Sequence, residues 1–149
     1  MFSRVLLCYD GSDAGRRALK RGAELAVLLK ARVFVLAIMP IGMADPMIAA
    51  AAAGQAFLGN SAEAAEQLLK TSINILTSLG VKAEGYVGYG CPIGQIVNHA
   101  KRFAIDLIVL GHYPQPPGGF WWSNNFRSSL AERVKCCIFL AIETNEKSL

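Results

Sequence analysis

Residues 4–12 read RVLLCYDGS, and this stretch decides the fold. Its first six residues form a short, largely apolar run with the length and composition of a buried strand. The run breaks at Asp10-Gly11-Ser12, a combination typical of a turn, after which Ser12 or Asp13 can cap a helix. Apolar side chains recur along that helix at helical spacing, at Leu19, Ala23, Ala26, Val27 and Leu28. The stretch predicts a strand, a tight turn and an amphipathic helix.

The same alternation of apolar runs and amphipathic segments continues along the chain. Further strands are expected at 32–38, 81–89, 106–110 and 137–142, and helices at 60–79, 92–103 and 129–135. Strands that alternate with helices predict a parallel sheet covered on both faces. With right-handed crossovers this is a three-layer, doubly wound, Rossmann-like α/β fold with a five-stranded parallel sheet. Such folds bind ligands at the carboxyl ends of strands where strand order reverses, here between the first and fourth strands.

The overall composition suits a single domain that spans residues 1–149. Hydrophobic residues make up 53% of the chain and charged residues 17%, which is enough apolar material for a full core. The net charge of +4 is mild and the basic residues are scattered, so we expect no nucleic-acid partner. The most apolar region, 47–58, is too short to span a bilayer, so no membrane insertion is expected.

The four cysteines, Cys8, Cys91, Cys136 and Cys137, form no Cys-x-x-Cys pair, and no histidine lies at ligand spacing from them. This pattern predicts reduced thiols, no metal site and a cytoplasmic location. The adjacent pair, Cys136 and Cys137, is interpreted as buried strand packing.

Three segments resemble the universal stress protein family, in the order and at the separations found there. They are VLLCYDGSDAGRRAL at 5–19, YGCPIGQIVNHAKRFAIDLIVLG at 89–111 and SSLAERVKCCIFLAI at 128–142. The resemblance runs nearly end to end, with gaps at 39–59 and 111–127. It implies the adenine nucleotide alpha-hydrolase-like fold, a stress-response or regulatory role, and an adenosine-sized cleft near Cys8, Asp10 and Ile38.

The phosphate loop of the ATP-binding members reads Gly-x-x-Gly, nine residues, then Gly-Ser or Gly-Thr. Its glycines let backbone N–H groups approach the phosphates. Gly111 matches the first glycine, but Pro114, which has no N–H, stands at the second position. Ser128 stands at the third, with Ser129 in the serine position, and thirteen residues rather than nine separate Pro114 from Ser128. The resemblance therefore implies a degenerate loop, with ATP binding weak or lost.

The resemblance also implies a set of ligand-binding residues for ATP, ADP or AMP. This set comprises Cys8, Asp10, Ile38, Gly111, His112, Tyr113, Ser128, Ser129 and Leu130.

Two of these assignments have a structural alternative. Asp10 either hydrogen-bonds a ribose or adenine, or it forms the turn that starts the helix. Ser128 and Ser129 either hold a phosphate or cap the last helix. Asp10 is the only obvious acid near the cleft, and no Cys, Ser or acid is placed to work with His112. No catalytic residue is therefore assigned.

The sequence does not decide the role of two segments, 111–127 and 39–59. In the loop 111–127, the rings of Phe120, Trp121 and Trp122 cover the cleft, pack on a dimer mate or await a protein partner. The segment 39–59 is irregular, and Ala49–Ala53 is its best candidate for a short helix.

Three functions follow from these observations. The first is a regulatory module that binds an adenine nucleotide weakly and signals through a homodimer; the resemblance implies pairing through the last strand, 137–142. The second is an ATP- or AMP-binding protein that acts as a nucleotide-dependent switch or a weak nucleotide hydrolase. The third is a dimeric interaction protein that has lost nucleotide binding.

Overall fold

A computed structural model describes residues 1–40, 61–112 and 124–142 of the chain. Strands and helices alternate along these residues, as the sequence predicts. The elements are β1 (Arg4–Tyr9), α1 (Asp13–Leu29), β2 (Arg32–Pro40), α3 (Ser61–Ser78), β3 (Ala83–Gly90), α4 (Pro92–Arg102), β4 (Leu107–Gly111), α5 (Asn124–Arg133) and β5 (Cys137–Ala141).

The five strands form one parallel sheet in the order β3-β2-β1-β4-β5. β1 is its central strand, with Val5 opposite Val33 of β2 on one side and opposite Leu107 of β4 on the other. The chain first adds strands on one side of β1 and then crosses to the other side. Strand order therefore reverses between β1 and β4, which confirms the predicted switch point.

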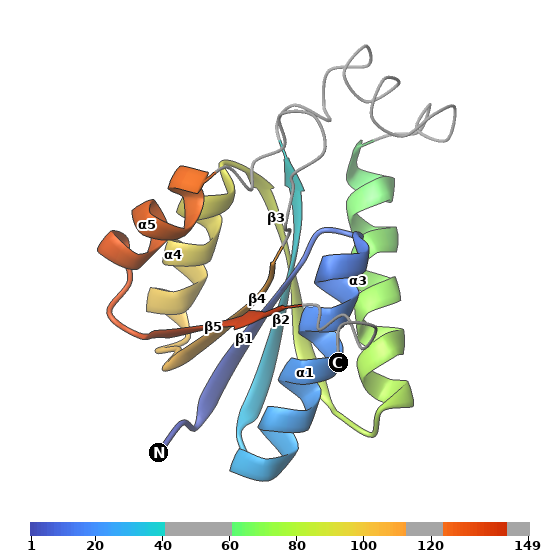
Figure 1. Ribbon diagram of the computed structural model, residues 1–149. Helices are drawn as coiled ribbons and strands as arrows, with labels where there is room; N and C mark the ends of the chain where they lie inside the picture. Colours follow the sequence, from blue (N-terminus) through green and yellow to red (C-terminus); the bar gives the residue numbers. More distant parts are fainter. Residues whose placement is uncertain (41–60, 113–123, 143–149) are drawn as a thin grey trace, which may run out of the picture.

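Helices cover both faces of the sheet, which confirms the three-layer arrangement. Figure 1 shows α1 and α3 on one side of the strands and α4 and α5 on the other. Two apolar cores fill the layers: one includes Leu7, Leu19 and Leu76, and the other includes Leu6, Phe34 and Ile96. Leu6 and Leu7 point to opposite faces because side chains alternate along a strand. In the described part of the chain, every helix is too short or too polar to cross a membrane.

Helix α1 begins as predicted but buries a narrower face than predicted. Ser12 is its N-cap, and its hydroxyl accepts a hydrogen bond from the backbone N–H of Gly15 at 3.0 Å. Ala23 and Ala26 are buried, whereas Val27 and Leu28 are 60% and 80% exposed. Each residue advances about 100° around a helix, so the two positions after Ala26 turn away from the sheet.

Helix α5 begins earlier than predicted, at Asn124 instead of Ser129. Phe126 and Leu130 are both buried in the second core, and they lie one helical turn apart. That spacing puts both side chains on the face that packs against the sheet, which favours a helix through residues 124–129. The loop predicted at 111–127 is correspondingly shorter at its carboxyl end. Elsewhere, predicted and observed boundaries differ by one or two residues, as in β3 and β4.

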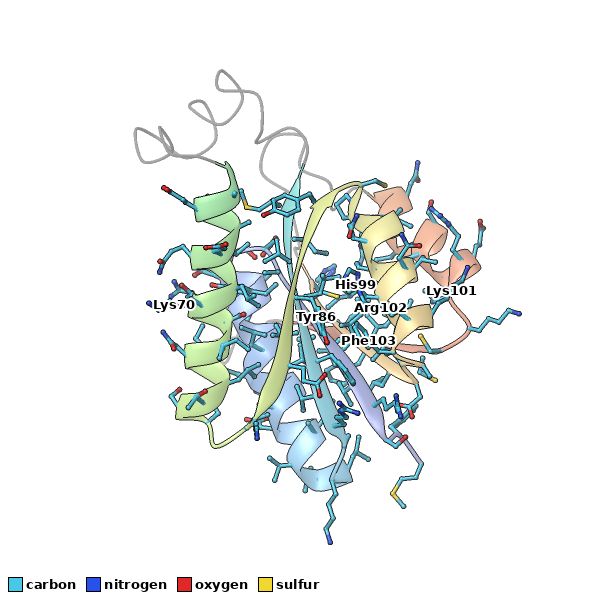
Figure 2. All side chains as sticks on the ribbon, turned by 180° about the vertical axis from the view of Figure 1, so that it is seen from behind. Lys70, Tyr86, His99, Lys101, Arg102 and Phe103 are labelled. Atoms are coloured by element: carbon cyan, nitrogen blue, oxygen red, sulfur yellow. The ribbon has the colours of Figure 1, made fainter. Side chains whose placement is uncertain are left out.

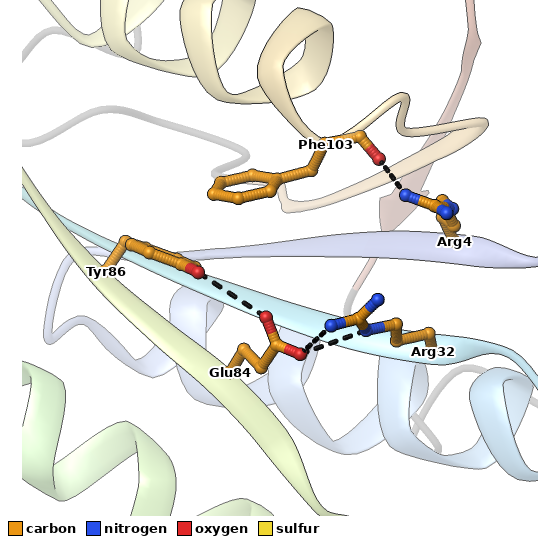
Figure 3. A network of polar contacts seen from close by, with 5 residues as sticks. All are labelled: Arg4, Arg32, Glu84, Tyr86 and Phe103. Carbon is orange, nitrogen blue, oxygen red and sulfur yellow. Dashed lines mark hydrogen bonds and ion pairs between the residues drawn. The ribbon is translucent and has the colours of Figure 1, made fainter.

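Side-chain interactions tie together the end of the sheet where the strands begin. Arg32 of β2 pairs with Glu84 of β3, and the Tyr86 hydroxyl lies 3.4 Å from a Glu84 carboxylate oxygen (Figure 3). Arg4 donates to the carbonyl of Phe103 at 2.9 Å, just beyond α4. The Phe103 ring lies 4.6 Å from that of Tyr86, and Figure 2 shows both between β3 and α4.

Asp106 fastens the start of the chain to this same end. Its carboxylate accepts hydrogen bonds from the backbone N–H groups of Ser3 (2.8 Å) and Arg4 (3.0 Å) and from the Ser3 hydroxyl. Burial alone would raise the pKa of Asp106, but these donors stabilise the charged form and the net pKa is lowered.

Candidate functional site

The switch point brings together the carboxyl ends of β1 and β4. β1 is followed by Asp10, and β4 ends at Gly111 and is followed by His112. Gly111 lies so close to helix α1 that a Cβ atom added there would be 2.2 Å from the carbonyl oxygen of Ala14. Only glycine permits this approach, which brings the first turn of α1 against the end of β4. The matched glycine therefore has a packing role that the sequence did not reveal.

Asp10 organises the turn between β1 and α1. Its Oδ1 accepts a hydrogen bond from the backbone N–H of Ser12 at 3.0 Å and another from the Ser12 hydroxyl. Gly11, between them, has a φ of 87°, which favours glycine. The helix-starting interpretation of Asp10 is thus confirmed. Contact with a ribose or adenine stays a prediction for Asp10.

Cys8, Ile38 and Leu130 lie in the core beneath this edge. Their side chains are at most 1% exposed and belong to the same apolar cluster between the sheet and helices α4 and α5. Burial raises the pKa of the Cys8 thiol strongly, and the charge of Asp10 raises it further. Burial and the raised pKa both disfavour the thiolate form of Cys8. In this structure these three side chains therefore have almost no surface open to a ligand.

His112 and Arg127 meet beyond the end of β4. The Arg127 Nη1 atom lies 2.7 Å from His112 Nδ1, and both side chains are half-buried. A guanidinium only donates hydrogen bonds, so Nδ1 must accept and the proton of the neutral imidazole lies on Nε2. The pair holds a permanent positive charge near the switch point. Arg127 was missed in the sequence because the residues around it were assigned to a loop.

Ser128 and Ser129 lie inside helix α5, one turn beyond its start. The Ser128 hydroxyl donates to the carbonyl of Asn125 at 3.1 Å. The prediction that these serines cap the last helix is therefore wrong, because the buried Phe126 extends the helix toward its amino end. Their predicted contact with phosphate is untested. Helical spacing of Phe126 and Leu130 is the sequence signal that identifies the earlier start.

Several predicted features lie outside the described residues. They include Tyr113 and Pro114, the Phe120–Trp122 rings, and the short helix predicted at Ala49–Ala53.

The four cysteines are all free. Cys137 is exposed and Cys136 is half-buried. The interpretation of the pair as buried strand packing is therefore wrong for Cys137, because this residue lies on β5, an edge strand of the sheet. Within residues 1–40, 61–112 and 124–142, no group of three or more histidine, cysteine, aspartate or glutamate side chains is arranged to hold a metal ion.

The doubly wound sheet and the Asp-Gly-Ser turn at its switch point define an α/β protein of the Rossmann-like class. The family model described as "Universal stress protein family" matches residues 1–137, and the chain belongs to that family. Universal stress protein YxiE of Bacillus subtilis is 29% identical over 120 residues, which are 74% of this chain and 79% of that protein.

Solved structures share the fold at lower identity. A universal stress protein in complex with cAMP has a TM-score of 0.67 at 18% identity, over 93% of this chain and 96% of that one. The Archaeoglobus fulgidus protein in complex with dAMP has a TM-score of 0.62 at 17% identity, over 94% and 97%. An Arabidopsis thaliana family member with AMP bound has a TM-score of 0.64 at 15% identity, over 99% and 95%.

Proposed function

We propose that this chain is a regulatory module of the stress response that binds an adenosine monophosphate at the carboxyl edge of β1 and β4. Three solved structures of the same fold were determined with cAMP, dAMP or AMP. The observation that carries the proposal for this chain is the Arg127–His112 pair, 2.7 Å apart beside the switch point. A nucleotide there meets a fixed cation and the backbone of the Asp10–Ser12 turn.

The same pair supports a preference for a single phosphate over a triphosphate. Pro114 has no N–H to offer where the family motif has a glycine, so one of the motif's backbone donors is missing. A guanidinium binds a phosphate through two parallel hydrogen bonds, which suits one phosphate group. Arg127 therefore replaces some of the missing backbone hydrogen-bond donors to the first phosphate. The β- and γ-phosphates of ATP add little binding energy, because few donors remain for them.

A thermal-shift screen tests this function directly. Binding to the native state raises the melting temperature in proportion to RT ln(1 + [L]/Kd). AMP and cAMP at equal concentration should raise it more than magnesium-ATP, and adenosine should raise it least. If no adenosine compound changes the melting temperature, the nucleotide proposal fails and a dimeric interaction protein becomes the better account. A larger shift with magnesium-ATP than with AMP would overturn the stated preference.

We also propose a homodimer that forms through β5. This strand lies at an edge of the sheet, where its outer backbone groups have no neighbouring strand within the described residues. Phe139 is 37% exposed on it, and Ile142, just beyond, is 61% exposed. Light scattering at micromolar concentration should give twice the chain mass, and Phe139→Lys should shift it toward the monomer. A wild-type monomer would contradict the proposal.

Two further assignments complete the proposed function. We place the protein in the cytoplasm, a compartment that keeps thiols such as its four free cysteines reduced. We also propose that the Phe120–Trp122 segment contacts the nucleotide or a protein partner. A blue-shifted tryptophan emission that changes with AMP supports contact with the nucleotide, and an emission fully quenched by acrylamide in both states supports a partner surface.

A further inference from the structure

A cavity of about 380 Å³ lies at the opposite end of the sheet from the switch point. It opens between the last turns of α4 and α5, beside the residues that lead into β4 and β5. We call it the basic groove, and it is lined by Val97, Ala100, Lys101, Ala104, Ile105, Arg133, Val134, Lys135 and Cys136. Its volume falls within the range of small-molecule sites.

The basic groove has an apolar floor. Val97, Ala100 and Ile105 are 4–7% exposed, and Val134 and Cys136 beside them are half-buried. These residues come from the inner face of α4, the turn after it and the segment that joins α5 to β5. A surface of this kind takes up an alkyl or aryl group, because the ligand loses contact with water without having to satisfy polar atoms.

The rim of the basic groove is cationic. Lys101, Arg133 and Lys135 are all exposed, and the lining includes no acidic residue. Within the described part of the chain, none of the three makes an ion pair. Figure 2 shows Lys101 near α5, whereas Arg102 lies near the Phe103 and Tyr86 rings. Among the described residues, the lining thus combines an apolar pocket with three cations that form no ion pair, and the carboxylate that acts on the lining is that of Asp106, beside Cys136.

Backbone hydrogen bonds close part of the two helix ends around the basic groove. The last carbonyls of a helix carry partial negative charge, which would repel an anion. Here the carbonyls of Ala100 and Lys101 accept hydrogen bonds from Ile105 (2.9 Å) and Ala104 (3.3 Å), and that of Leu130 accepts from Val134 (3.1 Å). Ala104 adopts a φ of 49° to close this turn. These three carbonyls therefore already accept a hydrogen bond from within the chain.

We propose that the basic groove is a second ligand site, which binds a small amphipathic carboxylate: an anionic head on a medium-length alkyl or aryl body. The apolar body packs on Val97, Ala100 and Ile105, and the carboxylate lies among Lys101, Arg133 and Lys135. Cations that only complement helix ends would explain Lys101 and Arg133. They would not explain Lys135, which lies beyond α5, or the apolar hollow that all three surround.

The first test titrates the ¹⁵N-labelled protein with octanoate and follows the backbone amide resonances. Octanol keeps the apolar body without the charge, and acetate keeps the charge without the body. Octanoate should shift the resonances of residues around Ala100, Ile105 and Val134 at concentrations where octanol and acetate do not. Equal effects of octanol and octanoate, shifts centred elsewhere, or no shifts at millimolar octanoate would each overturn the proposal.

Matched variants separate the rim cations from general surface charge. The variant Lys101→Gln/Arg133→Gln/Lys135→Gln keeps polar side chains on the rim and should weaken octanoate binding at least about tenfold. The control Arg16→Gln/Lys20→Gln/Lys70→Gln removes the same charge from exposed positions of α1 and α3, on the other face of the sheet. It should bind octanoate like the wild type. Equal weakening in both variants would contradict the proposed site.

Cys136 provides a second measurement that needs no bound ligand. In a Cys91→Ser/Cys137→Ser background, the remaining thiols are Cys136 and the buried Cys8. Cys136 attacks the disulfide of Ellman's reagent, a dianion, or of neutral 4,4′-dithiodipyridine, forming a mixed disulfide and releasing one aryl thiolate. The rim cations attract the dianion, so the rate with Ellman's reagent divided by the rate with 4,4′-dithiodipyridine should fall at least about threefold in the rim variant. The same ratio should stay constant in the control variant. A ratio unchanged in the rim variant would overturn the cationic site.

Discussion

The two ends of the sheet are held together by different means. Where the strands begin, side chains make the connections: Arg32 pairs with Glu84, Arg4 with the Phe103 carbonyl, and Asp106 with the start of the chain. Where β1 and β4 end, a close packing contact and a local turn make them: Gly111 packs directly on α1, and the Asp10 carboxylate closes the turn that leads into that helix.

The end where β1 and β4 finish is the one at which we propose nucleotide binding. Backbone N–H groups at helix starts and glycine turns approach phosphates closely, and the partial positive charge of the helix start favours anions. At the other end the helices finish, so an anion there would depend on Lys101, Arg133 and Lys135. In the two proposals above, the first end recognises its ligand through the backbone and one arginine, and the second through exposed cations around an apolar hollow.

The largest effect is expected at the closest backbone contact. Gly111→Ala places a Cβ 2.2 Å from a backbone oxygen of α1, so either the strand or the helix must shift. We expect a loss of about 3 kcal/mol in the free energy of unfolding, measured by urea denaturation. Gly94→Ala is the control, since its Cβ would have only a 3.9 Å contact and alanine favours a helix. Equal stability of the two variants would contradict the packing role of Gly111.

At the opposite end, Asp106→Asn should cost about 1–2 kcal/mol of unfolding free energy, because it removes the charge from a carboxylate that accepts several hydrogen bonds. The folded state lowers the pKa of Asp106, so its contribution is present at neutral pH and is lost as pH falls through the folded pKa. The difference between wild type and variant should therefore shrink below about pH 4. Glu66→Gln, on the exposed face of α3, should show no such convergence.

Arg127→Gln tests the proposed contact between Arg127 and the phosphate of the nucleotide. The variant should bind AMP about tenfold more weakly, because the phosphate loses a charged partner. Adenosine binding should change little, since adenosine carries no phosphate. Calorimetry with both ligands measures the two effects, and Lys82→Gln, which precedes β3 at the opposite end, is the matched control. An equal loss for AMP and adenosine would mean that Arg127 acts only by holding α5 in place.

The smallest effect is expected for the ion pair between Arg32 and Glu84. Both side chains are about half exposed, at 57% and 42%, so solvent screens their attraction. Glu84→Gln should lower the free energy of unfolding by less than about 1 kcal/mol, and 0.5 M salt should reduce the difference further. If Glu84→Gln lowered the free energy of unfolding as much as Asp106→Asn, the pair would stabilise the end of the sheet where the strands begin more strongly than an exposed ion pair should.

Local sequence patterns predicted the order of elements and the switch point well. β1 and β4 are apolar runs that end at a turn residue, at Tyr9-Asp10 and Leu110-Gly111, so burial and chain reversal coincide there in the sequence. Helix α1 shows the limit of the same reasoning. Val27 and Leu28 are apolar yet exposed, because the face of a helix that becomes buried is fixed by its contact with the sheet.

The candidate site was predicted less completely than the fold. Asp10, Gly111 and His112 follow directly from strand ends, but Arg127 depends on where α5 begins, and that is decided by burial of Phe126. The basic groove was not predicted, because Lys101 is far in sequence from Arg133 and Lys135 and joins them only where two helix ends meet.

The most direct test of the central claim is an NMR titration of the ¹⁵N-labelled protein with AMP. The account predicts that the amides of Gly11, Ser12, Ala14 and His112 shift together with one dissociation constant. Those of Glu84 and Lys135, at the other end of the sheet, should stay unchanged. The account would be contradicted if the shifts centred on the end of the sheet where the strands begin. It would also be contradicted if the resonances at the β1–β4 edge did not respond to millimolar AMP.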